Sequence, residues 1–151
     1  MSYWLMKSEP DAFSIDDLSA AGQAPWDGVR NYQARNFMRA MQPGDHFLLY
    51  HSSCQPPGIA GLGDIISAPY PDSTALDPNS HYHDPKASTE RLPWVAVDVG
   101  FTKKFPALLA LADIRQLNGL EELPLLQKGN RLSVMPITSE QWAILTAAAD
   151  V

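Results

Sequence analysis

The chain has 151 residues, a length typical of one domain, and 45% of them are hydrophobic, as in globular proteins. Its 17 acidic and 11 basic side chains give a formal net charge of −6. This charge excludes a protein that wraps duplex DNA in a uniformly basic shell, although it is compatible with a local basic patch. We therefore expect a single domain that spans residues 1–151.

The cysteine content and the N-terminal residues both argue against secretion. Cys54 is the single cysteine, so the chain forms no internal disulfide. The first ten residues contain no cationic stretch followed by an apolar run, as a signal peptide would. No apolar run approaches the roughly 18 residues that a membrane span needs. These features predict a cytoplasmic protein that makes no membrane contact.

Helix-capping patterns and hydrophobic spacing divide the first half of the chain into short elements. Ser14 and Asp17 have the spacing of a capping box, and Gly22 can end the helix that they begin. Asn31 can cap a second helix, whose apolar residues fall on one face. The predicted elements are a strand at 3–6, a helix at 14–22, a turn at 25–28, a helix at 31–41 and strands at 46–51 and 58–66.

The second half begins with a long, proline-rich excursion at 67–93, a kind of loop that tends to be functional or mobile. After it, Val95, Val97 and Val99 alternate as in a strand, and Thr138 with Gln141 forms a second capping box. The pattern predicts a mixed α/β domain built around a small curved sheet or barrel. Its elements are a strand at 94–101, short helices at 108–117 and 123–126, a strand at 131–134 and a final helix from 138.

Three arginines are segregated in an otherwise acidic chain. Between Gly28 and Gly44 the charged residues are Arg30, Arg35 and Arg39, with no acid among them. A guanidinium group can bind two oxygens of one phosphate. An aromatic ring such as that of Tyr32 can stack on an unpaired base, and this stacking contributes about 1–3 kcal/mol of binding free energy per base. This pattern favours nucleic-acid binding. The alternative is a solvated helix face on which one arginine pairs with an acid.

Aromatic and polar side chains also gather near the predicted turns. Trp26 and Tyr50 can supply flat walls, and Asn31, His51 and Ser52 can bind the polar edge of a base. The alternative is that both aromatic side chains belong to the core and that Asn31 is only a helix cap.

The stretch from His81 to Asp84 combines two histidines with a carboxylate, which are metal-ligand types. No further ligand group is apparent, and such histidines more often hold a loop against a sheet. We therefore expect neither a metal nor a cofactor.

A nucleophile and a base are neighbours in the run from His51 to Cys54. Sequence neighbours seldom face each other in a catalytic geometry, and the chain has no G-x-S-x-G motif. An enzyme that acts on a nucleotide or a small molecule stays the alternative function.

Four strings in this sequence resemble the EVE domain family, a branch of the PUA-like superfamily. The longest, W-D-G-V-R-N-Y-Q-A-R-N, spans residues 26–36, and the resemblance extends from residue 3 to about residue 145. It implies an α+β fold, a PUA-like curved β-barrel with flanking helices, related to the ASCH and YTH domains. It also implies a non-catalytic nucleic-acid-binding module that reads a modified base, either modified cytosine in DNA or a modified base in RNA. The other strings are Met6–Pro10, Tyr50–Ser52 and Arg131–Val134.

The family resemblance assigns candidate roles at the matching positions. The residues expected to form the base-binding pocket are Lys7, Ser8, Trp26, Val29, Asn31, Tyr32, Tyr50, His51, Ser52, Arg131 and Ser133. The segregated arginines, rather than the family strings alone, give the residues expected to hold phosphates, which are Arg30, Arg35 and Arg39.

Overall fold

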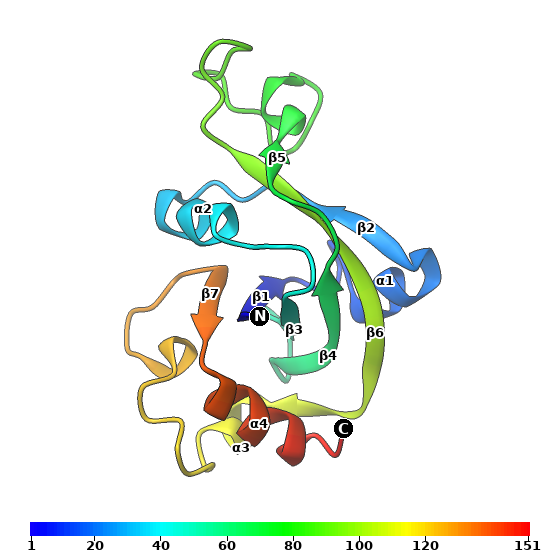
Figure 1. Cartoon of the computed structure of the whole chain (residues 1–151), viewed down its shortest axis with the longest axis vertical. Helices are drawn as coiled ribbons and strands as arrows, with labels where there is room; N and C mark the ends of the chain where they lie inside the picture. The colour runs from blue at the N-terminus through cyan, green and yellow to red at the C-terminus, as the bar shows by residue number, and fades with distance from the viewer.

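The computed structural model describes all 151 residues and contains a strongly curved mixed sheet with helices beside it (Figure 1). The strands are β1 (Tyr3–Ser8), β2 (Gln23–Trp26), β3 (His46–His51), β4 (Gly58–Ile65), β5 (Tyr70–Pro71), β6 (Val95–Ala110) and β7 (Val134–Ile137). The main path of the sheet is β2-β6-β4-β3-β1-β7, and β5 pairs with β6. β1 runs parallel to β3, and the other pairs are antiparallel.

Four α-helices and two 3₁₀ turns complete the fold. None of the helices is long and apolar enough to cross a membrane. The helices are α1 (Ile15–Ala21), α2 (Tyr32–Arg39), α3 (Leu111–Ile114) and α4 (Ser139–Ala148), and the 3₁₀ turns are η1 (Ser73–Leu76) and η2 (Pro124–Leu126).

The sheet is packed on both faces, so its central strands bury side chains on both sides. In β1, Trp4 and Met6 enter one core cluster, whereas Leu5 points to the other side and enters a second. This follows from the two-residue period of a strand. The first cluster lies beneath α1 and α2, and the second lies against α3, η2 and α4. β1 is thereby fixed from both sides up to its last residues.

The curved sheet does not close into a complete barrel. β2 and β7 are its edges, and each pairs with one neighbour. Both contain a proline, Pro25 and Pro136, which lacks the N–H that a central strand needs. α2 lies across the opening between β7 and β6 (Figure 1) and buries Ala34 and Met38 there. The predicted curved sheet is present, with a helix in place of the last strand pairing.

The helix starts that the sequence predicted are confirmed atom by atom. The Ser14 hydroxyl accepts a hydrogen bond from the Asp17 amide at 3.0 Å, and the Asp17 carboxylate accepts from the Ser14 amide at 2.9 Å. Thr138 and Gln141 make the equivalent pair of bonds at the start of α4. The Asn31 side chain accepts from the amide three residues on, at 2.9 Å.

Three predicted elements differ from the structure. The turn at 25–28 is partly strand, because β2 continues through Trp26. The helix at 108–117 shrinks to four residues, because β6 runs on through Ala110 and buries Phe105 and Leu109 in the second core. A spacing of four residues fits both a helix and a strand, so it did not discriminate. The last strand begins at Val134, where the prediction ended it.

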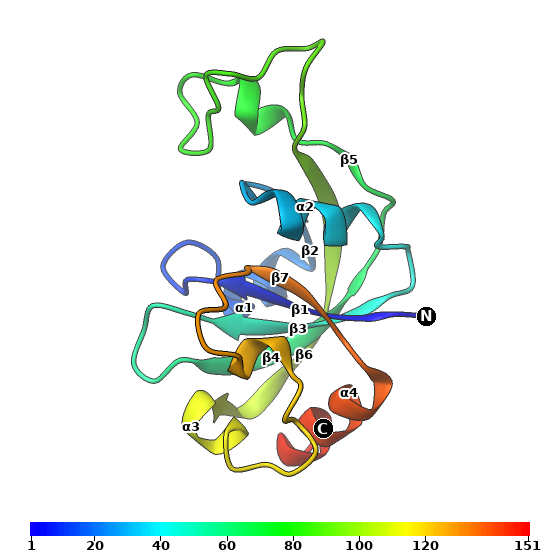
Figure 2. The ribbon, with the colours of Figure 1, turned by 90° about the vertical axis from the view of Figure 1, so that its left-hand side faces the viewer.

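The predicted excursion at 67–93 projects beyond the sheet and α2 (Figure 2). It contains β5 and η1, and its backbone closes on itself through a bond from the Asp84 amide to the Ala75 carbonyl at 2.8 Å. The Asp84 carboxylate accepts a bond from the Trp94 indole at 2.8 Å, which ties the excursion to the start of β6. The excursion therefore has a defined place over one end of the sheet.

Candidate functional site

A cavity of about 540 Å³ opens where β1 and β2 end, beneath the excursion. Four stretches of chain contribute to it, namely the end of β1 with the loop after it, the end of β2 with the next loop, the excursion, and the residue before β7. Its lining residues are Lys7, Ser8, Glu9, Ala12, Phe13, Pro25, Trp26, Asp27, Gly28, Val29, Arg30, His81, Tyr82 and Ser133. Six of them are among the residues that the sequence predicted, which are Lys7, Ser8, Trp26, Val29, Arg30 and Ser133.

Trp26 belongs both to the core and to the cavity. Its indole is 7% exposed and packs edge-on against Phe13 and Phe47, with ring centroids 6.2 and 6.1 Å away. The same side chain lines the cavity. Both interpretations of Trp26 therefore hold in part, because the ring is a packed core residue with a border on the hollow.

Lys7 brings a positive charge to the cavity. Its backbone N–H donates to the Ser133 carbonyl at 2.8 Å, which holds β1 against the residue before β7. Its ammonium lies 5.7 Å from the centre of the Tyr50 ring and forms no ion pair with a carboxylate. Burial lowers the pKa of Lys7 below its ordinary value. An anion that entered the cavity would relieve this cost by giving the ammonium a partner.

Asp27 brings a carboxylate that has no ion-pair partner. Burial, and after it the nearby Asp72 carboxylate, raise the pKa of Asp27 above its ordinary value. Its carboxylate accepts no hydrogen bond from another side chain. An ionisable group that lines a cavity and has a shifted pKa is typical of a functional site, because burial of its charge destabilises the fold and no internal contact fully compensates.

We predict that Asp27→Asn stabilises the protein at pH 7 and that the gain disappears in acid. The pKa is raised in the folded state, so folding takes up a proton and the unfolding free energy falls as pH rises through the two pKa values. Below about pH 3 the carboxyl is neutral in both states, and the variant should match the parent. Thermal unfolding at both pH values measures this, with exposed Asp11→Asn as control. A variant that is less stable than the parent at pH 7 would contradict the prediction.

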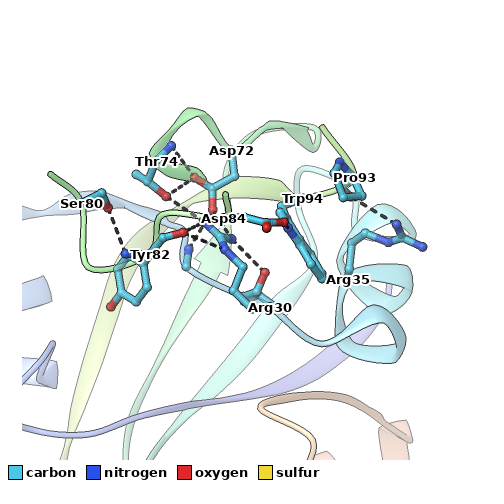
Figure 3. A network of polar contacts seen from close by, with 11 residues as sticks. Arg30, Arg35, Asp72, Thr74, Ser80, Tyr82, Asp84, Pro93 and Trp94 are labelled. Atoms are coloured by element: carbon cyan, nitrogen blue, oxygen red, sulfur yellow. Dashed lines mark hydrogen bonds and ion pairs between the residues drawn. The ribbon is translucent and has the colours of Figure 1, made fainter. Parts of the chain in front are cut away.

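Arg30 joins the loop after β2 to the excursion (Figure 3). Its guanidinium donates to the Asp72 carboxylate at 2.9 Å, to the Tyr82 carbonyl at 2.7 and 3.0 Å, to Thr74 and to the Val29 carbonyl. Arginine has five N–H donors, and here all five are used. Arg30 was predicted to bind a phosphate, but it has no N–H left for one. It forms an ion pair with Asp72 instead.

Asp72 accepts hydrogen bonds from three other parts of the same network. Burial alone would raise its pKa, but bonds from Thr74, the Gly28 amide and Arg30 outweigh this effect and hold the pKa below its ordinary value. The amide bond from Gly28 measures 2.8 Å. Asp72 is 1% exposed, so it stays a charged, fully partnered group inside the fold.

The Tyr82 ring packs directly on Gly28 and forms a wall of the cavity. Gly28 has a φ of +79°, and a Cβ built there would lie 2.6 Å from the Tyr82 ring. Gly28, in the string at 26–36, thus allows both a positive φ and the close approach of the Tyr82 ring, and a residue with a Cβ would prevent this contact. His81 and Tyr82 contribute to the site through this packing, and no group of three or more His, Cys, Asp or Glu residues forms a metal-binding cluster.

Tyr32, Arg35 and Arg39 lie together outside the cavity. Tyr32 is 59% exposed, and its ring stacks on Trp94 with centroids 4.8 Å apart. The Arg35 guanidinium lies 4.9 Å from the Tyr32 ring. Arg35 and Arg39 both donate to the Pro93 carbonyl, at 3.3 and 3.5 Å. The predicted arginine stripe therefore faces the start of β6, and none of these three residues lines the cavity.

Tyr50, His51 and Ser52 support the site without lining it. Tyr50 is 4% exposed and lies in the second core cluster. His51 Nδ1 donates to the Ser8 carbonyl at 3.1 Å, and its Nε2 accepts from the Ile15 amide at 3.3 Å. The Ser52 amide also donates to the Ser8 carbonyl. These residues hold the end of β1 in place, and His51 has no ring nitrogen free to act as a base.

Asn31 and Arg131 line a second hollow, of about 360 Å³, beside the first. It lies between the start of α2 and the loop that leads to β7. Its lining residues are Asn31, Gln33, Lys128, Gly129, Asn130, Arg131 and Leu132. Sequence reasoning assigned Asn31 and Arg131 to the same pocket as Trp26, whereas the structure places them in this neighbouring one.

Eight lining residues of the main cavity were absent from the prediction. Four of them are chain neighbours of predicted residues, and three of these four, Glu9, Asp27 and Gly28, lie within the strings at Met6–Pro10 and 26–36. His81 and Tyr82 come from the excursion, about fifty residues from Gly28 in sequence. The eight are Glu9, Ala12, Phe13, Pro25, Asp27, Gly28, His81 and Tyr82.

Comparison with known proteins places this arrangement in a family. The model of the EVE domain matches residues 2–148, and the chain belongs to the EVE domain family. Thymocyte nuclear protein 1 of Homo sapiens is 39% identical over 160 residues, which cover 93% of this chain and 71% of that protein.

Solved structures extend the likeness to the whole fold. A crystal structure of a Pseudomonas syringae protein has a TM-score of 0.96 and 62% identity, with 98% of this chain and 99% of that chain covered. The crystal structure of human THYN1 protein in complex with 5-methylcytosine containing DNA has a TM-score of 0.94 and 37% identity, covering 100% and 99%. The Mmi1 YTH domain, at a TM-score of 0.58 and 12% identity, shares the fold alone. The α+β architecture is thus the PUA-like fold that the sequence resemblance implied.

Proposed function

We propose that this protein is a non-catalytic nucleic-acid-binding module that reads a modified cytosine, held in the cavity beside Trp26. The observation that carries the proposal is the cavity itself, about 540 Å³ with aromatic, cationic and anionic groups on its walls. This volume lies in the range of small-molecule sites. The human relative with the same fold was solved with DNA that contains 5-methylcytosine, which supports the choice of base.

The chemistry of the walls suits a base that has left its stack. An enclosed base needs flat apolar surface and a few directed hydrogen bonds. Tyr82, Val29 and the border of Trp26 provide the apolar surface. A carboxylate such as that of Asp27 can accept from the amino group of cytosine, and Lys7 can donate to a carbonyl or phosphate oxygen. Recognition of one methyl group adds about 1–3 kcal/mol, so modest selectivity is expected.

The alternative, an enzyme that uses His51, Ser52 or Cys54, has none of these three groups at the cavity. Both nitrogens of His51 are committed to backbone groups, and the Cys54 thiol is directed to the carbonyls of His51 and Pro56. None of the three residues proposed for catalysis, His51, Ser52 and Cys54, lines the cavity. This arrangement favours the binding module.

The proposal predicts that filling the cavity abolishes recognition of the modified base. Ala12 is exposed and lines the cavity, so Ala12→Trp should fill it without disturbing the core. Ala20→Trp is the matched control, because Ala20 is exposed on α1 and does not line the cavity. Fluorescence anisotropy with labelled DNA and RNA strands, carrying cytosine or 5-methylcytosine at one position, measures affinity.

The parent and the Ala20→Trp control should bind the 5-methylcytosine strand roughly tenfold more tightly than the plain strand. Ala12→Trp should lose this preference together with most of its affinity. Equal binding of modified and plain strands by the parent would reject the reader function. Preserved selectivity in Ala12→Trp would mean that the base binds elsewhere.

A further inference from the structure

The second hollow is a basic recess in an acidic protein. It measures about 360 Å³, and its charged lining residues, Lys128 and Arg131, are both cationic. The remaining lining residues are neutral, and most are polar. The whole chain has a net charge of −6. A recess with two cations and no acid in its lining therefore stands out as a place for an anion.

Lys128 and Arg131 are available to an external partner. Both are exposed, and neither side chain makes a hydrogen bond or an ion pair within the protein. The arginines of the W-D-G string differ in this respect. Arg30 uses all its donors internally, and Arg35 is bound to Pro93 and Asn36.

The loop that carries the two cations is held in place by its own side chains. The Asn130 amide group donates to the Pro124 carbonyl at 2.7 Å, and its oxygen accepts from the Leu132 amide at 2.8 Å. Gln127 donates to the carbonyls of Glu121 and Leu123. An ordered loop presents its charges at a lower entropic cost than a flexible one.

The two hollows are neighbours along two stretches of chain. Arg30 lines the first and Asn31 the second, while Leu132 lines the second and Ser133 the first. The bond between the Lys7 amide and the Ser133 carbonyl fixes this boundary at the end of β1. The second hollow therefore adjoins the one proposed to hold the base.

We propose that the second hollow is a phosphate subsite, in which Lys128 and Arg131 hold the DNA backbone next to the nucleotide whose base occupies the main cavity. This inference rests on the proposed function and adds the path of the strand. The arginine can bind two oxygens of one phosphate, and the lysine acts as a point charge on the same or the next one. The strand thus passes the start of α2 and the loop before β7, rather than Arg35 and Arg39.

The salt dependence of binding tests the subsite. For a single strand, the magnitude of the slope of log K against log salt concentration falls by about 0.7 for each phosphate contact that is removed. The double variant Lys128→Gln/Arg131→Gln should lower it by about 0.7 where both cations hold one phosphate and by about 1.4 where they hold two, and should weaken binding at low salt by at least tenfold. The control is Lys103→Gln/Arg115→Gln, which removes the same two charge types at exposed positions outside both hollows.

Binding of single-stranded DNA with one central cytosine or 5-methylcytosine is measured between low and moderate sodium chloride. The double variant should keep the preference for the modified base, because the main cavity is intact, and the control should keep the slope. An unchanged slope, or an equal loss in the control, overturns the subsite. Loss of the preference along with the slope also overturns it, since the cations would then belong to the base site.

Failure of the proposed function gives a different result. If the parent does not prefer 5-methylcytosine but the double variant still loses slope, the reader function is rejected and the phosphate subsite stands. A parent that binds no strand at all rejects both. Thermal unfolding of each variant checks that the fold is retained, which surface positions such as these should allow.

Discussion

Asp72→Ala is expected to lower the unfolding free energy by about 3–5 kcal/mol, among the largest effects of any single change in this protein. Asp72 is 1% exposed and accepts bonds from Arg30, Thr74 and the Gly28 amide. Removal leaves the guanidinium of Arg30 without its counter-charge and the Gly28 amide without an acceptor. For a chain of this size, the melting temperature should fall by roughly 10 °C.

Urea and thermal unfolding measure this loss directly. The control is Glu90→Ala, an exposed acid in the same excursion that makes no ion pair. Binding should weaken as well, because Gly28 and Tyr82 line the cavity and are positioned by this network. A variant within 1 kcal/mol of the parent would show that the network positions the excursion without stabilising the fold.

Trp26→Ala is expected to destabilise the protein by about 3–5 kcal/mol, in the range for a buried aromatic side chain. The indole is 7% exposed and fills space against Phe13 and Phe47. A loss of binding in this variant could therefore result from a disrupted core as well as from the loss of the indole that lines the cavity. Trp26→Phe retains an aromatic ring in the core and should cost less.

Unfolding curves and binding curves of both Trp26 variants separate these effects. We expect Trp26→Ala to lose both stability and binding, and Trp26→Phe to keep the fold with a smaller change in affinity. If Trp26→Ala melts like the parent and yet fails to bind, the indole serves the ligand and not the core.

Local signals in the sequence were sufficient for the helices that begin with a capping residue. Ser14, Asn31 and Thr138 each bond to an amide three residues away, so the whole motif lies within one window of sequence. The apolar alternation of Val95, Val97 and Val99 likewise predicted the first half of β6. These features depend on neighbours in the chain and are visible without the fold.

The missed strands depend on their place in the sheet. Pro25 was assigned to a turn, but it lies in the edge strand β2, and Pro136 lies in the other edge strand, β7. A missing N–H is tolerated in an edge strand. The last three residues of β6, 108–110, were assigned to a helix, because the leucines at 108, 109 and 111 fit either structure. Only the pairing with β4 settles this stretch as strand.

The candidate site shows the same division. The strings around Lys7 and Trp26 identified one side of the cavity, because those residues are consecutive in the chain. The pairing of Arg30 with Asp72 joins residues 42 positions apart, and the sequence does not reveal which acid an arginine meets. His51 looked chemically active, whereas its two backbone bonds make it a support for the end of β1.

Arg30 donates its hydrogen bonds to the backbone carbonyl of Tyr82, a group that every residue has. Whatever residue stands at position 82, the main chain there can keep the same anchor. The side chain at position 82, which borders the cavity, can therefore be exchanged while the bonds to its carbonyl are kept, so a change at this one position can alter the shape of the cavity and leave the surrounding fold as it is.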